Sequence, residues 1–331
     1  MDLSIVTTLY CSAPYVEKFY VRVCAAAEKI TSNFEIVFVN DGSPDDSLDI
    51  ALSLYRTDRR IRIVNLSRNF GHHKALMTGL DQARGDLVFL IDSDLEEEPE
   101  LLEEFHARLK DTRADVVFGV QKARKGNYFE RFTGALFFRI FNLLSTHPIP
   151  ANHITARLMS RRYVTALLQH KEREFIISGL WTLTGFEQVP IAVRKHHSSR
   201  TTYGPAQKIA HLVNAITSFS GKPLVLIFYL GCFILLLSSV AAVDMIVRRI
   251  FLKTQLQGWA SLIVSIWLLG GMTIFCLGVI GIYLSKIFLE VKRRPYTIIK
   301  EIFENDGPDF EDRGLNGEDA SRERKDVHEL R

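Results

Sequence analysis

Residues 86–99 read DLVFLIDSDLEEEP, in which an apolar strand runs directly into a cluster of acidic side chains. Asp92 and Asp94 follow the strand with one residue between them, and Glu96, Glu97 and Glu98 come next. Acidic residues stabilise the first turn of a helix, which explains Glu97 and Glu98 but does not require the two aspartates. Carboxylates at a strand end also converge on hard cations such as Mg²⁺ or Mn²⁺, which take oxygen ligands. Asp92 and Asp94 are therefore candidate ligands of a cation that also binds a diphosphate.

The alternation of apolar strands with helical stretches extends in both directions from this segment. Strand signals occur at 3–10, 34–40, 61–67, 86–92 and 114–120. Because these strands are apolar on both faces and helices lie between them, they predict an α/β fold with a mainly parallel sheet covered on both sides. Ligands of such sheets bind outside the carboxyl ends of the strands. No GxGxxG follows the first strand and no GxxxxGK[ST] occurs, which disfavours a dinucleotide-binding or P-loop protein.

Composition narrows the function classes further. The 331 residues carry a formal net charge of only +3, with no basic stretch interleaved with aromatic residues, so we expect no nucleic-acid partner. The four cysteines form no CxxC pair, which is typical of a reducing compartment and argues against structural zinc. The N-terminus MDLSIVTTLY lacks the basic region of a signal peptide and is predicted to be the first strand, on the cytoplasmic side.

Two long apolar stretches occur in the last third of the chain. Residues 223–243 and 259–285 contain no charged side chain, and each is long enough to cross a hydrocarbon core, which takes about 20 helical residues. We predict transmembrane helices at 223–247 and 259–285, with buried helices of a soluble protein as the alternative. Seven Lys and Arg residues in the flanks, against three in the connecting loop, favour flanks on the cytoplasmic side.

The remaining segments divide the chain into a large domain and membrane-associated parts. We predict a cytoplasmic domain at 1–205. Within it, residues 127–145 are amphipathic and rich in aromatic side chains, and residues 206–222 form a second amphipathic segment. Both fit interfacial helices that lie on a bilayer, and packing on the sheet is the alternative. Residues 303–331 are polar and poor in apolar side chains, which predicts a disordered cytoplasmic tail.

Together these segments resemble glycosyltransferase family 2 with its GT-A fold, and within it the polyprenyl-phosphate glycosyltransferases, a group that includes dolichyl-phosphate mannose synthase. The resemblance covers residues 3–223, and the two apolar stretches that follow match the bacterial branch. The matching segments are SIVTTLY, EIVFVNDGSPDDS, LSRNFGHHKALMTGLDQARGDLVFLIDSDLEEEPELL, RLMSRRYV and ITSFSGKPL. The resemblance implies an inverting, metal-dependent transfer of a sugar from a UDP- or GDP-linked donor to polyprenyl (undecaprenyl or dolichyl) phosphate.

The resemblance also implies roles for individual residues. The nucleotide sugar would contact Thr8, Tyr10, Asp41, Arg68, Asp92 and Ser93. The metal, Mg²⁺ or Mn²⁺, would be held by Asp92, Asp94 and Glu96, the last at a position where relatives often carry glutamine. Arg157 is implied as a catalytic residue, and Arg131 and Arg200 would position the acceptor phosphate, because the guanidinium fork binds phosphate oxygens in pairs. The alternative for each arginine is a solvated surface charge.

Two departures from the family pattern concern acidic residues. The first strand ends Tyr10-Cys11-Ser12, where relatives have tyrosine-asparagine-glutamate, and Thr155 stands where they have an aspartate. The second departure removes a candidate general base, for which His147 and His153 are nearby substitutes. A phosphate acceptor tolerates this loss because it is already largely ionised near pH 7, whereas a sugar hydroxyl benefits from a base.

We therefore expect a multi-pass enzyme of the cell (inner) membrane with its catalytic domain in the cytoplasm. We also expect a homo-oligomer, with a tetramer as one arrangement. Three alternatives stay open: transfer to a hydroxyl of a lipid-linked glycan, a processive polysaccharide synthase, and a non-catalytic membrane scaffold. The sequence has no Gln-x-x-Arg-Trp stretch, which argues against the synthase, and the retained Asp92-Ser93-Asp94 argues against the scaffold.

Overall fold

The computed structural model describes residues 1–121, 153–173, 175–193, 217, 221–251 and 258–305. The predicted acceptor-phosphate residues Arg131 and Arg200 and the candidate base His147 lie outside these residues. The amphipathic segment 127–145 and nearly all of 206–222 also lie outside them, as does the predicted tail from residue 306 onward.

One eight-stranded sheet, in the order β7-β5-β6-β4-β1-β2-β3-β8, forms the centre of the α/β domain. The strands are β1 (Leu3–Leu9), β2 (Phe34–Asn40), β3 (Ile61–Leu66), β4 (Leu87–Leu90), β5 (Val116–Gln121), β6 (His153–Ser160), β7 (Gln188–Val193) and β8 (Ile299–Phe303). The first five correspond to the five strands that the sequence predicts. The α/β class with a Rossmann-like core is confirmed: β4, β1, β2 and β3 are neighbours and run parallel.

The sheet is mixed rather than mainly parallel, because two later strands enter it in the opposite direction. Strand β6 lies between β4 and β5 and is antiparallel to both. Strand β8 is antiparallel to β3 at one edge.

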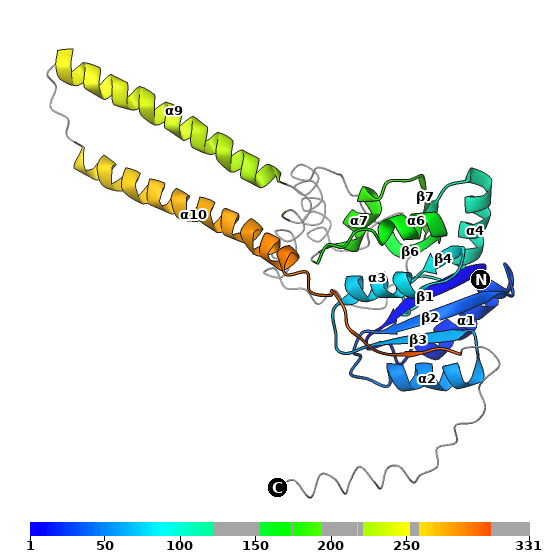
Figure 1. The fold of residues 1–331 in the computed structure, drawn as a ribbon. Coiled ribbons are helices and arrows are strands. Elements are labelled where there is room, and N and C mark those ends of the chain that lie inside the picture. The colour runs from blue at the N-terminus through cyan, green and yellow to red at the C-terminus, as the bar shows by residue number, and fades with distance from the viewer. Residues whose placement is uncertain (122–152, 174, 194–216, 218–220, 252–257, 306–331) are drawn as a thin grey trace, which may run out of the picture.

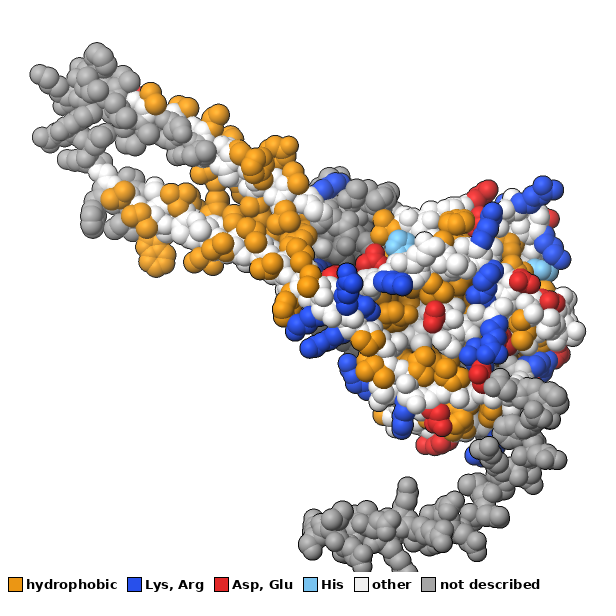
Figure 2. Space-filling model, viewed as in Figure 1, with side chains coloured by type: hydrophobic (Ala, Val, Ile, Leu, Met, Phe, Trp, Pro, Cys, Tyr) orange, Lys and Arg blue, Asp and Glu red, His pale blue; other side chains and the backbone are white. Residues whose placement is uncertain are grey.

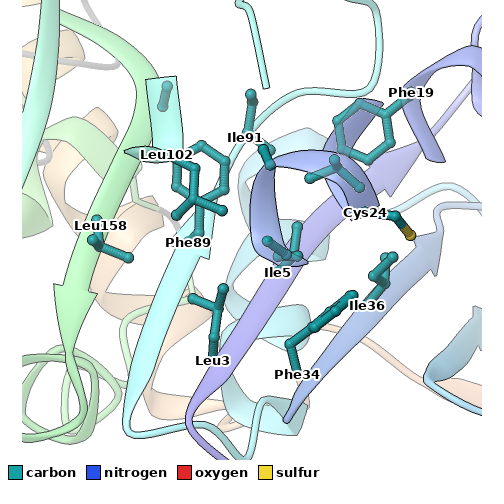
Figure 3. Packing of buried hydrophobic residues seen from close by; sticks show 14 of the residues in the cluster. Leu3, Ile5, Phe19, Cys24, Phe34, Ile36, Phe89, Ile91, Leu102 and Leu158 are labelled. Atoms are coloured by element: carbon teal, nitrogen blue, oxygen red, sulfur yellow. The ribbon is translucent and has the colours of Figure 1, made fainter. Parts of the chain in front are cut away.

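Helices cover both faces of the sheet, as the sequence predicts (Figure 1). One hydrophobic cluster joins the sheet to α1 (Val16–Glu28), α2 (Ser47–Thr57) and α4 (Leu101–Thr112), and the other joins it to α3 (His72–Gln82), α6 (Arg161–Leu167) and α7 (Ile177–Leu183). Successive strand residues alternate between the clusters: Ile5 belongs to the first and Val6 to the second. Figure 3 shows Leu102 from α4 beside Phe89 from β4 in the first cluster.

A pair of long helices, α9 (Lys222–Phe251) and α10 (Trp259–Val291), extends away from the α/β domain (Figure 1). Hydrophobic side chains cover the described part of their surface, and Lys and Arg side chains gather where the pair joins the domain (Figure 2). Among the described residues, one stretch, Ser265–Val291, is long and apolar enough to cross a membrane, and Lys222–Ile234 is a shorter apolar stretch. Both predicted spans are therefore helical where the structure describes them, but within those described residues one candidate span is found.

After α10 the chain returns to the sheet as β8, a strand that is not among those the sequence predicts. Residues 299–303 read IKEIF, in which charged side chains hide the strand signal. Beyond the pairing with β3, the Glu304 carboxylate lies 3.0 Å from Arg62 and 2.7 Å from Arg84. The hydroxyls of Thr297 and Thr78 are 2.8 Å apart, which joins this segment to α3. The segment after α10 is thus part of the α/β domain.

Candidate functional site

Polar loops leave the carboxyl ends of the four central parallel strands at the same edge of the sheet. They are residues 10–12 after β1, 41–43 after β2, 67–71 after β3 and 91–98 after β4. One close approach brings two of these loops together. A Cβ added to Gly42, which has a φ of +60°, would lie 2.5 Å from the backbone of Arg68 and Asn69. The loops after β2 and β3 can pack this tightly only because residue 42 is glycine.

An imidazole connects two of the predicted site residues across this edge. His72, the first residue of α3, has Nδ1 3.2 Å from the Thr8 hydroxyl and Nε2 3.4 Å from Oδ1 of Asp92. Oδ1 of Asp92 is buried and has no hydrogen-bond partner within the part of the chain that the structure describes. A buried carboxylate oxygen without a partner is costly. The arrangement therefore fits a cation or a substrate group that binds Asp92.

A hydrogen bond within the Asp92–Glu98 loop fixes the position of Asp94. Oδ1 of Asp94 accepts a hydrogen bond from the backbone N–H of Glu96 at 2.9 Å, and Leu95 between them has a φ of 60°. Asp94 remains half-buried, whereas Glu96 is buried. Among the described residues, no group of three or more His, Cys, Asp or Glu side chains is arranged to hold a metal ion. The predicted roles of Asp92, Asp94 and Glu96 as metal ligands therefore stay predictions.

Ser93, between the two aspartates, ties β4 to the end of β1. Its hydroxyl donates to the Thr8 carbonyl at 2.9 Å and lies 3.1 Å from the Ser12 hydroxyl.

Tyr10 is half-exposed at the rim of the loop after β1. Cys11 beside it has a φ of 54°, and its N–H donates to the Ser43 hydroxyl at 2.8 Å. Thr8, Asp92 and Ser93 therefore lie close together at this edge, and the contacts of Thr8, Tyr10, Asp92 and Ser93 with a nucleotide stay predictions.

Asp41, predicted to contact the nucleotide, holds the loop before α3. Its two carboxylate oxygens accept hydrogen bonds from the backbone N–H groups of Phe70 at 2.7 Å and Gly71 at 3.1 Å. Burial raises the pKa of Asp41, and these two backbone hydrogen bonds partly oppose that shift. The nearby Arg68 guanidinium lies over the Phe70 ring, 4.1 Å from its centroid. Asp41 thus fixes the start of α3 and with it the position of His72.

Glu97 does not serve the next helix, which corrects the expectation from the sequence. Helix α4 begins only at Leu101, and Glu97 is 1% exposed. Its carboxylate accepts hydrogen bonds from the backbone N–H groups of Thr155 at 3.1 Å and Ala156 at 2.7 Å. The acidic loop is therefore fastened to β6, at the position where the sequence lacks the expected aspartate.

Arg157 is not a solvated surface charge. Its side chain is 1% exposed, and its guanidinium lies over the Trp181 ring and contacts the carbonyls of Thr155 and Ile154. Burial lowers the pKa of Arg157 to about 9, while the charges of Tyr163 and Glu97 oppose that shift. The group stays cationic near pH 7. The Arg157 guanidinium therefore places a buried positive charge beside residues 154 and 155 of β6.

A cavity of about 280 Å³ opens beside this charge, between α3, β6 and α7. It is lined by His72, His73, Leu76, Gln121, His153, Ile154, Thr155, Ile177, Ser178 and Trp181. The ring of His153 packs edge-on against Trp181, with centroids 5.8 Å apart. His72 lines this cavity and also contacts Asp92, so the cavity lies next to the Asp92 carboxylate.

Three features are not predicted from the sequence: the contact of His72 with Asp92, the hydrogen bonds from β6 to Glu97, and the contact of Trp181 with Arg157. His72 could have been found, because a polar side chain that opens a helix after a buried parallel strand lies at the ligand-binding edge. Nothing local in the sequence signals that Glu97 contacts β6 or that Trp181 lies on Arg157, since both contacts join segments far apart in the chain.

Comparisons with known proteins relate this chain to glycosyltransferases. The family model for Glycosyl transferase family 2 matches residues 4–168. A Mycobacterium tuberculosis protein named as a glycosyltransferase is 56% identical over 306 residues, which cover 92% of this chain and 90% of that protein. A Shigella flexneri protein named as a prophage-derived bactoprenol glucosyl transferase is 33% identical over 308 residues, 91% of this chain and 98% of the relative. The structure of a Mycobacterium tuberculosis glucosyl-3-phosphoglycerate synthase has a TM-score of 0.43 at 18% identity, with coverage of 65% and 78%.

Proposed function

The chain belongs to glycosyl transferase family 2, and we propose that it transfers a sugar from a nucleoside-diphosphate donor to polyprenyl phosphate at a membrane. The observation that carries this proposal is the buried Asp92 oxygen without a hydrogen-bond partner, next to His72 at the ligand-binding edge of the sheet. That oxygen fits a group with positive charge or a donor hydrogen, which a substrate complex would supply.

The donor would lie along this edge, with its diphosphate near the Asp92–Asp94 loop. Asp92 and Asp94 would hold Mg²⁺ or Mn²⁺, which prefer carboxylate oxygens. When bound, the cation supplies positive charge that stabilises the leaving nucleoside diphosphate. His72, which the Thr8 hydroxyl contacts, would orient Asp92, and Asp41 holds the backbone that carries His72. The sequence-based contacts of Tyr10, Arg68 and Ser93 with the nucleotide belong to the same proposal.

The proposed acceptor is supported by relatives and by the chemistry of the missing aspartate. Relatives from Shigella flexneri and from a Shigella phage are named bactoprenol glucosyl transferases, and each match covers 91% of this chain. Thr155 cannot act as a carboxylate base, and a phosphate acceptor needs none because it is ionised near pH 7. A hydroxyl of a lipid-linked glycan is the acceptor that would need such a base.

We place the chain in a membrane through α9 and α10, which would cross it twice. Ser265–Val291 has the length and composition of a span, and Lys292, Arg293 and Arg294 follow it directly and are exposed. Positive residues favour the cytoplasmic side of a span. Because β8 returns from α10 to the sheet, this end of the helix pair lies on the same side as the α/β domain (Figure 1). The domain would therefore face the cytoplasm.

The test is sugar transfer by purified protein in lipid vesicles, with UDP- and GDP-sugars as donors. Polyprenyl phosphate and a lipid-linked glycan are offered as separate acceptors. We expect transfer to the phosphate, and a loss of about 10²–10³-fold in kcat for Asp94→Ala, the cost typical of removing one electrostatic stabiliser. Asp46→Ala is the matched control, since Asp46 is exposed at the start of α2 and makes no side-chain cap.

Two outcomes would contradict the proposal. Full activity of Asp94→Ala, or full activity in excess chelator, would exclude the metal role of the strand-end aspartates. Transfer to the glycan hydroxyl with none to polyprenyl phosphate would replace the proposed acceptor.

A further inference from the structure

We propose that four positive side chains at the end of α10 bind the headgroups of anionic phospholipids. They are Arg173, Lys292, Arg293 and Arg294, and together they form the α10 cationic cluster. Figure 2 shows Lys and Arg side chains gathered where the helix pair meets the domain. The proposal rests on the proposed placement of α9 and α10 in a membrane, and it adds the class of lipid that this surface selects.

The fold adds Arg173 to three positive residues that are adjacent in the sequence. Arg173 is 120 residues from Arg293 along the chain, and its guanidinium donates a hydrogen bond to the Arg293 carbonyl at 3.2 Å. The backbone N–H of Arg173 donates to the carboxylate of Glu290, in the last turn of α10, at 2.6 Å. These two contacts hold Arg173 at the end of α10. A fourth positive charge therefore lies beside the run 292–294.

The cluster lies where a bilayer would change from hydrocarbon to headgroups. The candidate span Ser265–Val291 ends one residue before Lys292, and Lys292, Arg293 and Arg294 are exposed. The Lys292 ammonium lies over the ring of Phe288, 4.1 Å from its centroid, and that ring is itself exposed. Lysine side chains lie along apolar surface in this way while the ammonium stays in a polar environment. A ligand of this cluster would therefore lie at the membrane surface.

The backbone at Arg293 is a second observation that favours a role for its charge. Arg293 follows the C-cap Lys292 and has a φ of 47°, in the left-handed region. Glycine is the usual residue at this position, because a side chain makes the left-handed conformation unfavourable. Positive charge near the end of a helix also interacts favourably with the helix dipole, which is an alternative explanation for Lys292. That effect is confined to the last turn and does not account for Arg173 or Arg294.

Positive charge exceeds negative charge in the segments that form the cluster. Residues 170–173 and 290–294 contain five Lys or Arg side chains against two Glu side chains. Glu290 accepts the Arg173 N–H, and Glu172 lies 3.5 Å from Nδ1 of His170. Like charges this close repel one another unless an anion compensates them. An anionic membrane surface supplies that compensation, and each Lys or Arg near it strengthens the attraction about fivefold.

Anionic headgroups fit the cluster better than zwitterionic ones. The three guanidinium groups can bind phosphate oxygens of either kind of lipid in pairs. A phosphatidylcholine headgroup also carries a quaternary ammonium, which the positive side chains repel. Phosphatidylglycerol carries no such cation. We therefore expect the cluster to select phosphatidylglycerol over phosphatidylcholine.

Lipid competition with the full-length protein tests this selection. Purified protein in a non-ionic detergent is mixed with equal amounts of the two lipids, and the lipids that stay bound after size-exclusion chromatography are quantified by mass spectrometry. We expect the wild type to prefer phosphatidylglycerol about tenfold, and Arg173→Gln to lower this preference about fivefold. Arg173→Lys, which keeps the charge, should retain most of the preference. The triple variant Lys292→Gln/Arg293→Gln/Arg294→Gln should bind the two lipids almost equally.

A charge-matched control separates the cluster from the net charge of the protein. Lys18→Gln/Arg56→Gln/Arg59→Gln removes three positive charges from exposed positions on α1 and at the end of α2, and it should keep the wild-type preference. Raising the NaCl concentration from about 0.1 M to about 1 M shortens the Debye length from about 10 Å to about 3 Å and should weaken the preference of the wild type. Equal retention of both lipids by the wild type would overturn the proposal. An unchanged preference in the triple variant at 292–294, or an equal loss in the control, would also overturn it.

The membrane placement and the lipid selection fail in different ways. If alkaline carbonate extracts the wild-type protein from phospholipid vesicles, α9 and α10 do not cross the membrane and the proposed placement is wrong. If the protein stays in the vesicles but shows no preference for phosphatidylglycerol, only the lipid selection is wrong.

Discussion

Nε2 of His72 lies 3.4 Å from Oδ1 of Asp92, an oxygen that is buried and has no hydrogen-bond partner among the described residues. The other ring nitrogen lies 3.2 Å from the Thr8 hydroxyl, so the imidazole is held between the ends of β1 and β4. We therefore predict that His72 positions the carboxylate that we propose as a metal ligand.

Replacing His72 tests this role. We expect His72→Ala to lower kcat/KM about 10–100-fold and to raise the Mn²⁺ concentration needed for half-maximal activity, as is typical when a group that orients a metal ligand is removed. His72→Gln, which keeps a donor at this position, should recover part of the loss. Unchanged metal dependence in His72→Ala would show that the imidazole does not orient Asp92.

Glu97 should be a major contributor to stability. Its carboxylate accepts two backbone hydrogen bonds from β6, and its charge acts on the buried Arg157. Glu97→Ala leaves buried N–H groups and a buried cation without this partner, so we expect a loss of about 2–4 kcal/mol in the free energy of unfolding. Glu103→Ala is the control, because Glu103 pairs with Lys29 at the surface and such pairs contribute about 0–1 kcal/mol. Equal losses in denaturant unfolding of the two variants would contradict this ranking.

Cys11 should report on donor binding. It is exposed at the end of β1, whereas Cys24 is buried in the core, and burial raises the pKa of the Cys24 thiol to about 11. Maleimides react with exposed thiolates, so we expect labelling of Cys11 and little labelling of Cys24, read by peptide mass spectrometry. A nucleoside diphosphate with Mg²⁺ should slow the labelling of Cys11, and Asp92→Ala should abolish this protection. Labelling of Cys11 at the same rate with and without nucleotide would place the donor elsewhere.

The stabilising contribution of Asp45 should be lost in acid. Burial raises its pKa, but hydrogen bonds from the hydroxyls of Ser43 and Ser47 and from the backbone N–H groups of Ala13 and Ser47 outweigh that effect and lower the pKa to about 2. The folded state thus favours the ionised form. The stability that Asp45 contributes is present above the unfolded value near 3.8 and is lost as the pH falls through about 2.

Comparison of the wild type with Asp45→Asn tests this pH dependence. The difference between their free energies of unfolding should be constant from pH 7 to 5 and should shrink below about pH 4. A difference that grows in this acidic range would have the wrong sign for a depressed pKa.

The sequence predicts the first five strands because their signal is local. Each is a short apolar run bounded by polar residues, and both of its faces are buried. The positions of Asp92 and Asp94 at the ligand-binding edge follow from the same logic. Strands β6 and β8 are not predictable in this way, because their places in the sheet depend on antiparallel pairing with distant partners, and β8 carries charged residues on an exposed edge.

The candidate site, like the fold, could be predicted only in part from the sequence. Residue types at strand ends indicate where a ligand binds, but they do not show what each side chain contacts. Asp41 and Glu97 look alike in the sequence, as acids after a buried strand, and both accept backbone hydrogen bonds from other segments. Asp92 differs from both in having a buried oxygen without a hydrogen bond among the described residues, and only the folded arrangement reveals that difference.

The return of the chain through β8 affects how a soluble form of this protein would behave. A chain that stops before Lys222 lacks β8, so the backbone N–H and C=O groups of β3 would be open along one side. Open strands of this kind pair with other molecules and aggregate, whereas β8 presents Lys300 and Glu301 to solvent at this border. A short linker that replaces α9 and α10 but keeps residues 296–305 should therefore give a better-behaved soluble enzyme than simple truncation.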